Sequence, residues 1–346
     1  MLSERSTRIL RIGTPIVIGV ILALVVAWAR AGRGSEVSKK LARTSMGTEF
    51  HEEPIYIGSL IPSGDDHALQ PYALCSTGDH FLICYLHSNR IDILDKQFKN
   101  TEILDVTRGS HGSITGIAAD DSVIYIADSQ RGEIRWYSFR GDLLRLFDRL
   151  PDGSPYRPHS LALNEGILYV TDRYHSQLLA VNVGETDVFV QEGEIIYSIP
   201  PNPVKHPLFS TPNTVMITPD GRTLVTDQSL GQVHVLTCNG QYAYQFKTVA
   251  EEPLLEPAGI AMDNVQSPHL LAMADSAFMP SGIHQQGRYH VVDTEAGDVK
   301  VFDATGDYIF SYGDELEKPS DIAIDQTTHA VLIADIALKA LMIYKY

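Results

Sequence analysis

EPAGIAMD, residues 256–263, is the stretch of this sequence that decides the fold. A polar residue and a proline lead into a short apolar run that ends in an aspartate, which is typical of a β-strand entered from a turn. The pattern returns along the chain at intervals of roughly 40 residues or more, and such a period is the signature of a repeat architecture. The other copies are QPYALC (70–75), SITGIAAD (113–120), RPHSLAL (157–163), TPNTVMI (211–217) and KPSDIAID (318–325).

Three further short strands follow most copies of this pattern. In the second repeat they are VIYIADS (123–129), EIRWYSF (133–139) and DLLRLF (142–147). Four short antiparallel strands in each repeat form one blade of a propeller. The sequence therefore predicts an all-β fold, a six-bladed β-propeller over residues 53–346. In the third repeat we assign the fourth strand to DVFVQ (187–191).

The sixth repeat has no fourth strand before Tyr346, while EPIYIGSL (53–60) precedes the first repeat and belongs to none. A closed ring leaves fewer unpaired strand edges, and such edges promote aggregation. We therefore predict that residues 53–60 form the closing strand of blade six. Two longer connections, over residues 184–210 and 264–288, are candidates for binding or contact roles.

EPAGIAMD and VIYIADS resemble the NHL-repeat family, six-bladed propellers whose repeats carry P-x-G-I-A-x-D followed by I-Y-V-A-D-S. The resemblance covers about residues 53–346 and implies the fold rather than one function. PHSLAL (158–163), followed by a strand that ends in Asp172 and Arg173, is also similar to the peptidyl-hydroxyglycine lyases of this propeller type. In those enzymes the histidine after such a proline binds zinc, and three blades each contribute one ligand.

His159 is the residue that this second resemblance singles out as a zinc ligand. A catalytic zinc needs about three protein ligands around an open position. The equivalent positions in the other blades hold Tyr72, Thr115, Asn213, Ala258 and Ser320. Because none of them is histidine, we predict no metal, no cofactor and no catalytic residue, and we lean against an enzyme. The candidate residues of the channel face are Tyr72, Thr115, His159, Arg173, Asn213 and Ser320.

Aspartate recurs at the end of the second strand in five repeats, as Asp128, Asp172, Asp227, Asp293 and Asp335. A residue that chemistry needs once is not repeated in each blade, whereas a residue that holds a turn is. Aspartate side chains accept hydrogen bonds from backbone N–H groups of the turn that follows them. We therefore predict a structural role for this set rather than a calcium or catalytic site.

The 346-residue chain carries a net charge of −16, distributed unevenly. Residues 1–43 contain eight basic and two acidic residues, and the remainder contains 19 basic and 41 acidic residues, a balance of about −22. The strongly acidic region of residues 44–346 repels phosphate backbones, which argues against nucleic acid as a partner. It is suited to basic partners, such as a basic soluble protein. Of the three cysteines, we expect Cys75, Cys84 and Cys238 to be free thiols in or near the core.

Residues 12–30 form the predicted transmembrane helix, which consists of the uncharged run IGTPIVIGVILALVVAWA (12–29) followed by Arg30. A basic tail (1–11) precedes it, a linker (31–52) follows it, and the anchor residues are Ile12, Ile18, Ile21, Leu24 and Trp28. A cleaved signal peptide is the alternative, because AWA and ARA resemble cleavage sites. Short basic tails usually stay in the cytoplasm, which favours an extracytoplasmic, periplasmic propeller.

These features predict a membrane-anchored propeller that acts without catalysis. The expected role is a scaffold or an accessory subunit of a larger membrane complex, which could be respiratory, photosynthetic or secretory. One alternative is a propeller enzyme of the lyase or lactonase type that uses the central channel. Another is a ligand-sensing propeller.

Overall fold

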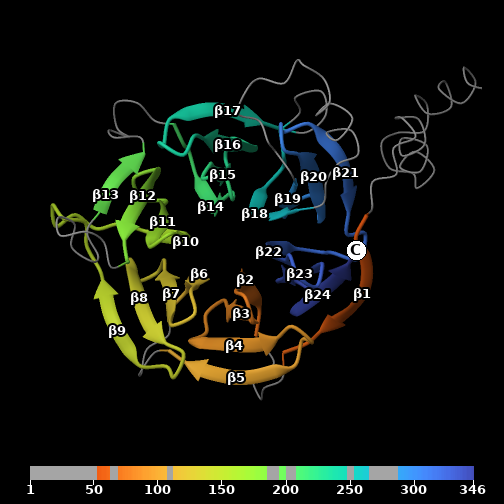
Figure 1. Cartoon of the computed structure of the whole chain (residues 1–346), viewed down its shortest axis with the longest axis horizontal. Helices are drawn as coiled ribbons and strands as arrows, with labels where there is room; N and C mark the ends of the chain where they lie inside the picture. Colours follow the sequence, from red (N-terminus) through yellow and green to blue (C-terminus); the bar gives the residue numbers. More distant parts are fainter. Residues whose placement is uncertain are drawn as a thin grey trace, which may run out of the picture. The chain divides into compact units, whose positions relative to one another are not determined.

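The computed structural model describes residues 53–62, 69–106, 112–184, 195–199, 208–247, 253–264 and 287–346. Within these ranges the chain forms six four-stranded sheets that lie around a common axis (Figure 1). The predicted all-β, six-bladed propeller is therefore confirmed. The predicted transmembrane helix and its anchor residues lie outside the described residues. In the part of the chain that is described, no helix is long and apolar enough to cross a membrane.

The first strand of each blade lies nearest the axis, and the second pairs with it antiparallel (Figure 1). The first strands are β2 (Pro71–Ser76), β6 (Ile114–Ala119), β10 (Pro158–Asn164), β14 (Pro212–Ile217), β18 (Pro257–Asp263) and β22 (Pro319–Asp325). The second strands are β3 (His80–Tyr85), β7 (Val123–Asp128), β11 (Ile167–Asp172), β15 (Thr223–Asp227), β19 (Arg288–Asp293) and β23 (Ala330–Asp335). Every first strand begins where the repeat pattern places it.

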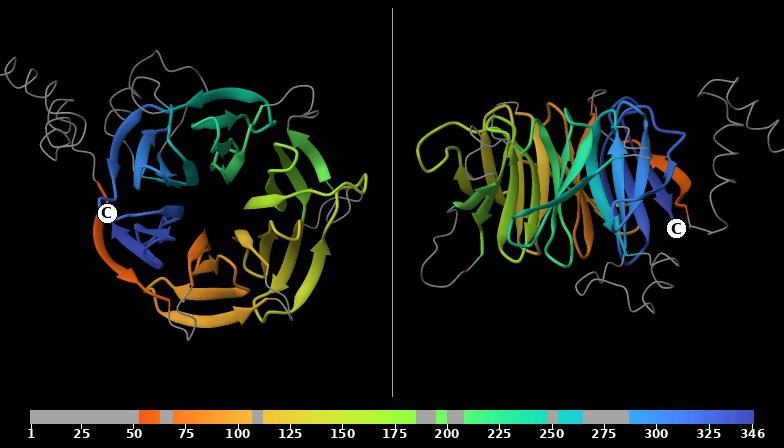
Figure 2. Two further views of the ribbon diagram at one scale, coloured as in Figure 1. Left: turned by 180° about the vertical axis from the view of Figure 1, so that it is seen from behind. Right: turned by 90° about the horizontal axis from the view of Figure 1, so that it is seen from above.

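The third and fourth strands complete each blade toward the rim, as both faces of the ring show in Figures 1 and 2. The third strands are β4 (Arg90–Asp95), β8 (Glu133–Ser138), β12 (Gln177–Asn182), β16 (Gln232–Leu236), β20 (Asp298–Asp303) and β24 (Ala340–Lys345). The outer strands are β5 (Asn100–Asp105), β9 (Leu143–Phe147), β13 (Ile195–Ile199), β17 (Tyr242–Phe246), β21 (Tyr308–Tyr312) and β1 (Ile55–Leu60).

The ring is closed by β1, as the sequence predicts. This strand pairs antiparallel with β24, from Ile55 opposite Lys345 to Leu60 opposite Leu341. Blade six therefore takes its outer strand from the residues that precede blade one. The two blades also share an apolar cluster that includes Leu74 and Leu332. The chain thus fastens its last blade to its first by a strand pairing and by a common core.

Two expectations about blade three and the cysteines are wrong. The outer strand of blade three is β13, not residues 187–191, which lie outside the described residues. The long insertion separates β12 from its partner, so the chain position of the fourth strand does not follow the spacing of the other blades. All three cysteines are free, but Cys238 is exposed because it lies in the turn between β16 and β17, while Cys84 is buried and Cys75 is half-buried.

The repeated aspartates hold the turns of their blades, as predicted. Asp335 is fully buried. Its carboxylate accepts hydrogen bonds from the backbone N–H groups of Glu317 and Lys318, before β22, and of Ala337 and Leu338, in the turn after β23. One side chain therefore binds both the entry to the blade and the following turn. Four other aspartates do the same in their blades: Asp128, Asp172, Asp227 and Asp293.

Neighbouring blades approach each other most closely at their first strands. A side-chain carbon on Gly116 would lie 2.6 Å from the carbonyl oxygen of His159 in the next blade. The same addition to Gly259 would lie 2.5 Å from a carboxylate oxygen of Asp321. Close backbone approach therefore explains the glycine of the G-I-A pattern in these two blades. The hydroxyl of Thr226 also joins adjacent blades, because it donates a 2.8 Å hydrogen bond to the carbonyl of Ala258.

A second set of buried polar groups joins blades five and six. One carboxylate oxygen of Asp263 lies 2.9 Å from Nη2 of Arg288, 2.7 Å from Nε2 of His290 and 2.7 Å from the hydroxyl of Tyr346. Asp263, Arg288 and His290 are nearly inaccessible to solvent. Because its partners are a cation and two hydrogen-bonding rings, the buried carboxylate is fully compensated. This cluster is part of the packing between blades five and six.

Candidate functional site

The first strands bring polar side chains from different blades to one cavity of about 80 Å³ at the propeller axis. In all six blades the pairing of first and second strands is irregular directly after the first residue of the strand. Such an irregularity redirects side chains that would otherwise alternate. The second and third residues of these strands therefore contribute to the cavity wall. Its polar side chains belong to Tyr72, Thr115, His159, Ser160, Asn213, Thr214, Ser320 and Asp321.

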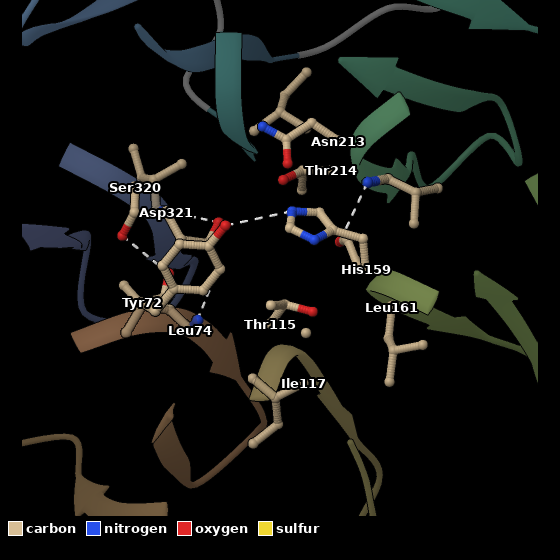
Figure 3. A pocket seen from close by; sticks show the side chains of 15 residues that line it. Tyr72, Leu74, Thr115, Ile117, His159, Leu161, Asn213, Thr214, Ser320 and Asp321 are labelled. Atoms are coloured by element: carbon tan, nitrogen blue, oxygen red, sulfur yellow. Dashed lines mark hydrogen bonds between the residues drawn. The ribbon is translucent and has the colours of Figure 1, made fainter. Parts of the chain in front are cut away.

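Five of the six predicted channel-face residues line this cavity (Figure 3). Arg173 is not among the lining residues. It follows β11 and donates hydrogen bonds of 2.8 Å to Oδ1 of Asn213 and 3.0 Å to Oε1 of Gln228. Its guanidinium also donates to the carbonyl of Pro212 at 3.3 Å. Arg173 therefore supports Asn213, whose amide nitrogen in turn donates to the carbonyl of Pro257.

Tyr72 and His159 face each other across the cavity. The Tyr72 hydroxyl lies 3.4 Å from Nε2 of His159, and the two rings meet edge to face with centroids 6.1 Å apart (Figure 3). Burial, together with the positive charge of Arg173, holds the pKa of His159 well below its usual value. Burial likewise raises the pKa of Tyr72. Near neutral pH the pair is therefore a neutral imidazole and a neutral phenol, which donate and accept hydrogen bonds without carrying charge.

Thr115 presents a hydroxyl that has no hydrogen-bond partner among the described residues. Its side chain lines the cavity and is only 9% exposed, and its Oγ1 is inaccessible and unbonded. A buried polar atom without a partner costs free energy, about 1–3 kcal/mol. In Figure 3 the Thr115 side chain lies below the ring of His159. The hydrogen-bonding capacity of this hydroxyl is therefore unused within the described residues.

Sequence reasoning missed three polar residues of the cavity wall, Ser160, Thr214 and Asp321, of which Asp321 is the one that can carry charge. It is the third residue of its first strand, where the other blades have Ala73, Gly116, Ser160, Thr214 and Gly259. Its Oδ2 accepts the backbone N–H of Leu74 at 2.8 Å, and its Oδ1 accepts the N–H of Ile322 at 2.9 Å. Burial raises the pKa of Asp321 to about 7, against the effect of these two bonds. The sequence did contain an indication of its role, because Asp321 is the one charged residue at a repeat position that otherwise holds small residues.

The cavity does not have the donors of a metal centre. Among the described residues, no group of three or more histidine, cysteine or acidic side chains is placed to hold a metal ion. A catalytic zinc needs about three protein ligands, and His159 is the one imidazole of the cavity wall. The lining can instead form hydrogen bonds, accept or supply a proton at Asp321, and hold a small polar molecule.

Comparisons with known proteins support the fold and no particular family. No family model matches the chain, and no curated protein matches its sequence. The NHL resemblance thus remains a prediction. Three solved structures of similar fold are lyases. An inactive histidine-to-alanine variant of virginiamycin B lyase from Staphylococcus aureus, with quinupristin, shares 12% identity over 83% of this chain and 87% of its own, with a TM-score of 0.54.

Two further structures give the same result. A streptogramin B lyase shares 13% identity over 85% of this chain and 88% of its own, with a TM-score of 0.54. Selenomethionine-substituted virginiamycin B lyase from Staphylococcus aureus shares 13% identity over 84% of this chain and 99% of its own, with a TM-score of 0.55. Identities this low establish a shared propeller architecture, and function must be argued from the site.

Proposed function

We propose that this protein is a membrane-anchored six-bladed propeller that works by binding. In this proposal the axial cavity holds a small polar ligand, while the acidic body contacts other subunits of a membrane complex. The observation that carries the ligand site is the unpartnered Thr115 hydroxyl, which lies in the cavity wall beside the neutral imidazole of His159. Native proteins satisfy nearly all buried polar groups, so such an atom indicates a missing partner.

The Thr115→Val substitution tests the ligand site. Valine keeps the shape and removes the unpartnered hydroxyl, so we expect unchanged or slightly higher stability of the ligand-free protein. The matched control is Thr226→Val, which removes the hydroxyl that donates to Ala258 in the next blade. That change should lower the free energy of unfolding by about 1–3 kcal/mol. Both values would be measured by thermal and urea unfolding of the full-length chain in detergent.

Binding itself is measured by the shift of the melting temperature with small amines, carboxylates, amides and polyols. At least one of these classes should raise the melting temperature of the wild type and of Thr226→Val, and raise that of Thr115→Val less. If no class does so, or if Thr115→Val is destabilised as strongly as Thr226→Val, the cavity is only a structural feature and the ligand-binding role is wrong.

A lyase-type enzyme is the second candidate function. It is favoured by the facing phenol and neutral imidazole of Tyr72 and His159, two groups that can transfer protons in general acid–base catalysis. The similarity of fold to virginiamycin B lyase is consistent with it. The two functions differ in the fate of the ligand. A binding protein returns the compound unchanged, whereas a lyase converts it, and mass spectrometry of the same incubations distinguishes the two.

The role in a membrane complex rests on the predicted anchor over residues 12–30 and on the acidity of the remaining chain. A negatively charged surface favours association with basic proteins and makes that association sensitive to salt. After gentle detergent extraction we expect the protein to migrate with partner subunits on a native gel. Deletion of residues 1–35 should release it. Migration as a lone monomer, under conditions that preserve other complexes of the same membrane, would contradict this role.

A further inference from the structure

We propose that the axial cavity binds a primary ammonium group, with the carboxylate of Asp321 as its counter-ion. This inference rests on the proposed ligand-binding role and names the chemical class of the ligand. Asp321 lines the cavity, and its carboxylate accepts hydrogen bonds from backbone N–H groups of β2 and β22. Among the described residues, no lysine, arginine or histidine forms an ion pair with it.

The fold itself does not require an acid at this position. Two blades have glycine there, and the others have alanine, serine and threonine. Placing a carboxylate in a mostly enclosed space without a cation is costly, and proteins normally pair such a group. Retention of an unpaired acid at the axis is therefore best explained by a positively charged ligand.

The other cavity groups suit the N–H donors of an ammonium group. The Thr115 hydroxyl is unpartnered within the described residues, and the Tyr72 oxygen can accept a hydrogen bond while its hydroxyl donates to Nε2 of the neutral His159. These three side chains and Asp321 line the same cavity (Figure 3). The ring of Tyr72 adds a face that attracts cations. A cavity of about 80 Å³ has room for a small aminated group and not for a large ligand.

Other charged ligands fit less well. Calcium takes six to eight oxygen ligands and magnesium about six, and this wall offers a single carboxylate. An anion would need a free cation, but Arg173 is bonded to Asn213, Gln228 and the carbonyl of Pro212 and does not line the cavity. The single carboxylate of Asp321 thus favours an ammonium ligand, although the positive charge of Arg173 acts on the same cavity.

Binding should depend on pH through Asp321. The ionisable groups nearest to Asp321 are Tyr72 and Cys75 of β2 and Cys84 of β3, whose pKa values it raises. His159 lines the same cavity, and Arg173 is held by Asn213 outside the lining. Because burial raises the pKa of Asp321 to about 7, the carboxyl is protonated below that pH and must lose its proton when a cation binds. Affinity should therefore fall about tenfold for each pH unit below about 7, and stay constant above it.

The test uses the full-length chain in detergent and isothermal titration calorimetry. Methylammonium and ethanolammonium chloride are the probes, with ethylene glycol, acetate, magnesium and calcium as comparisons. We expect saturable binding of the two ammonium ions that weakens below pH 7. Asp321→Ser introduces the residue that blade three has at this position, and should weaken that binding at least tenfold. The matched control is Asp152→Ser in an exposed turn, which should bind as the wild type does.

The outcomes separate this inference from the proposed function. If ethylene glycol or acetate binds instead and Thr115→Val weakens it, the cavity is a ligand site but the ammonium assignment is wrong. If magnesium or calcium binds and Asp321→Ser abolishes that binding, the ammonium assignment is also wrong and the cavity is a metal site. If ammonium binds Asp321→Ser as well as the wild type, the role of the carboxylate is wrong. If Asp321→Ser does not fold, Asp321→Asn takes its place in the same titrations. If no probe binds, both the ammonium assignment and the proposed ligand-binding role are wrong.

Discussion

Replacing residues 55–60 with a glycine–serine segment of equal length should destabilise the propeller by about 5 kcal/mol or more. The change removes the pairing of β1 with β24, uncovering a strand that is almost entirely buried, including Leu341, Met342 and Tyr344. Typical domains are stable by only about 5–15 kcal/mol. Much of the chain should therefore unfold or aggregate through the open edge of blade six. Urea unfolding and size-exclusion chromatography would measure both effects.

The control retains the strand and changes only its exposed side chains. Ile55 and Ile57 are 70% and 55% exposed. Because the pairing of β1 with β24 remains, Ile55→Ser and Ile57→Ser should change the unfolding midpoint little. An equal loss of stability in these variants would indicate that apolar side chains, rather than ring closure, matter at β1. A segment replacement as stable as the wild type would show that the ring does not need this strand.

The Asp335→Ala substitution should cost about 4 kcal/mol or more. It leaves four backbone N–H groups, those of Glu317, Lys318, Ala337 and Leu338, without the acceptor that holds them. Each unsatisfied buried donor costs about 1–3 kcal/mol, partly recovered where water enters. Asp335→Asn retains one oxygen acceptor and should cost about half as much. Urea unfolding of the full-length chain gives both values.

Asp152→Ala provides the surface control for this experiment. Asp152 accepts bonds from Ser154 within an exposed turn, so its removal should leave the melting temperature unchanged. A cost at Asp335 no greater than at Asp152 would contradict the turn-holding role. The same comparison applies to the four equivalent aspartates, since each carboxylate binds the entry of its own blade.

The sequence alone determined the architecture, because the strongest evidence was periodic. Six copies of one strand pattern predicted six blades, and an unassigned strand before the first copy predicted the closure by β1. The recurrence of aspartate at one position predicted its turn-holding role. These features depend on local sequence or on the number of repeats, so they can be predicted without the tertiary structure. The prediction of the outer strand of blade three was wrong for the same reason, because a long insertion changes the spacing between the third and fourth strands of that blade.

Only the tertiary structure decided the candidate site. The second position of the repeat gave five residues of the cavity wall, but nothing in the sequence shows that Thr115 lacks a partner or that Arg173 is held behind Asn213. The sequence shows that Asp321 is the one acidic residue at its repeat position. Its proposed role as a counter-ion, however, depends on its having no ion-pair partner among the described residues. The physical reason is that charge compensation and burial depend on distances between blades, and those distances are set when the ring closes.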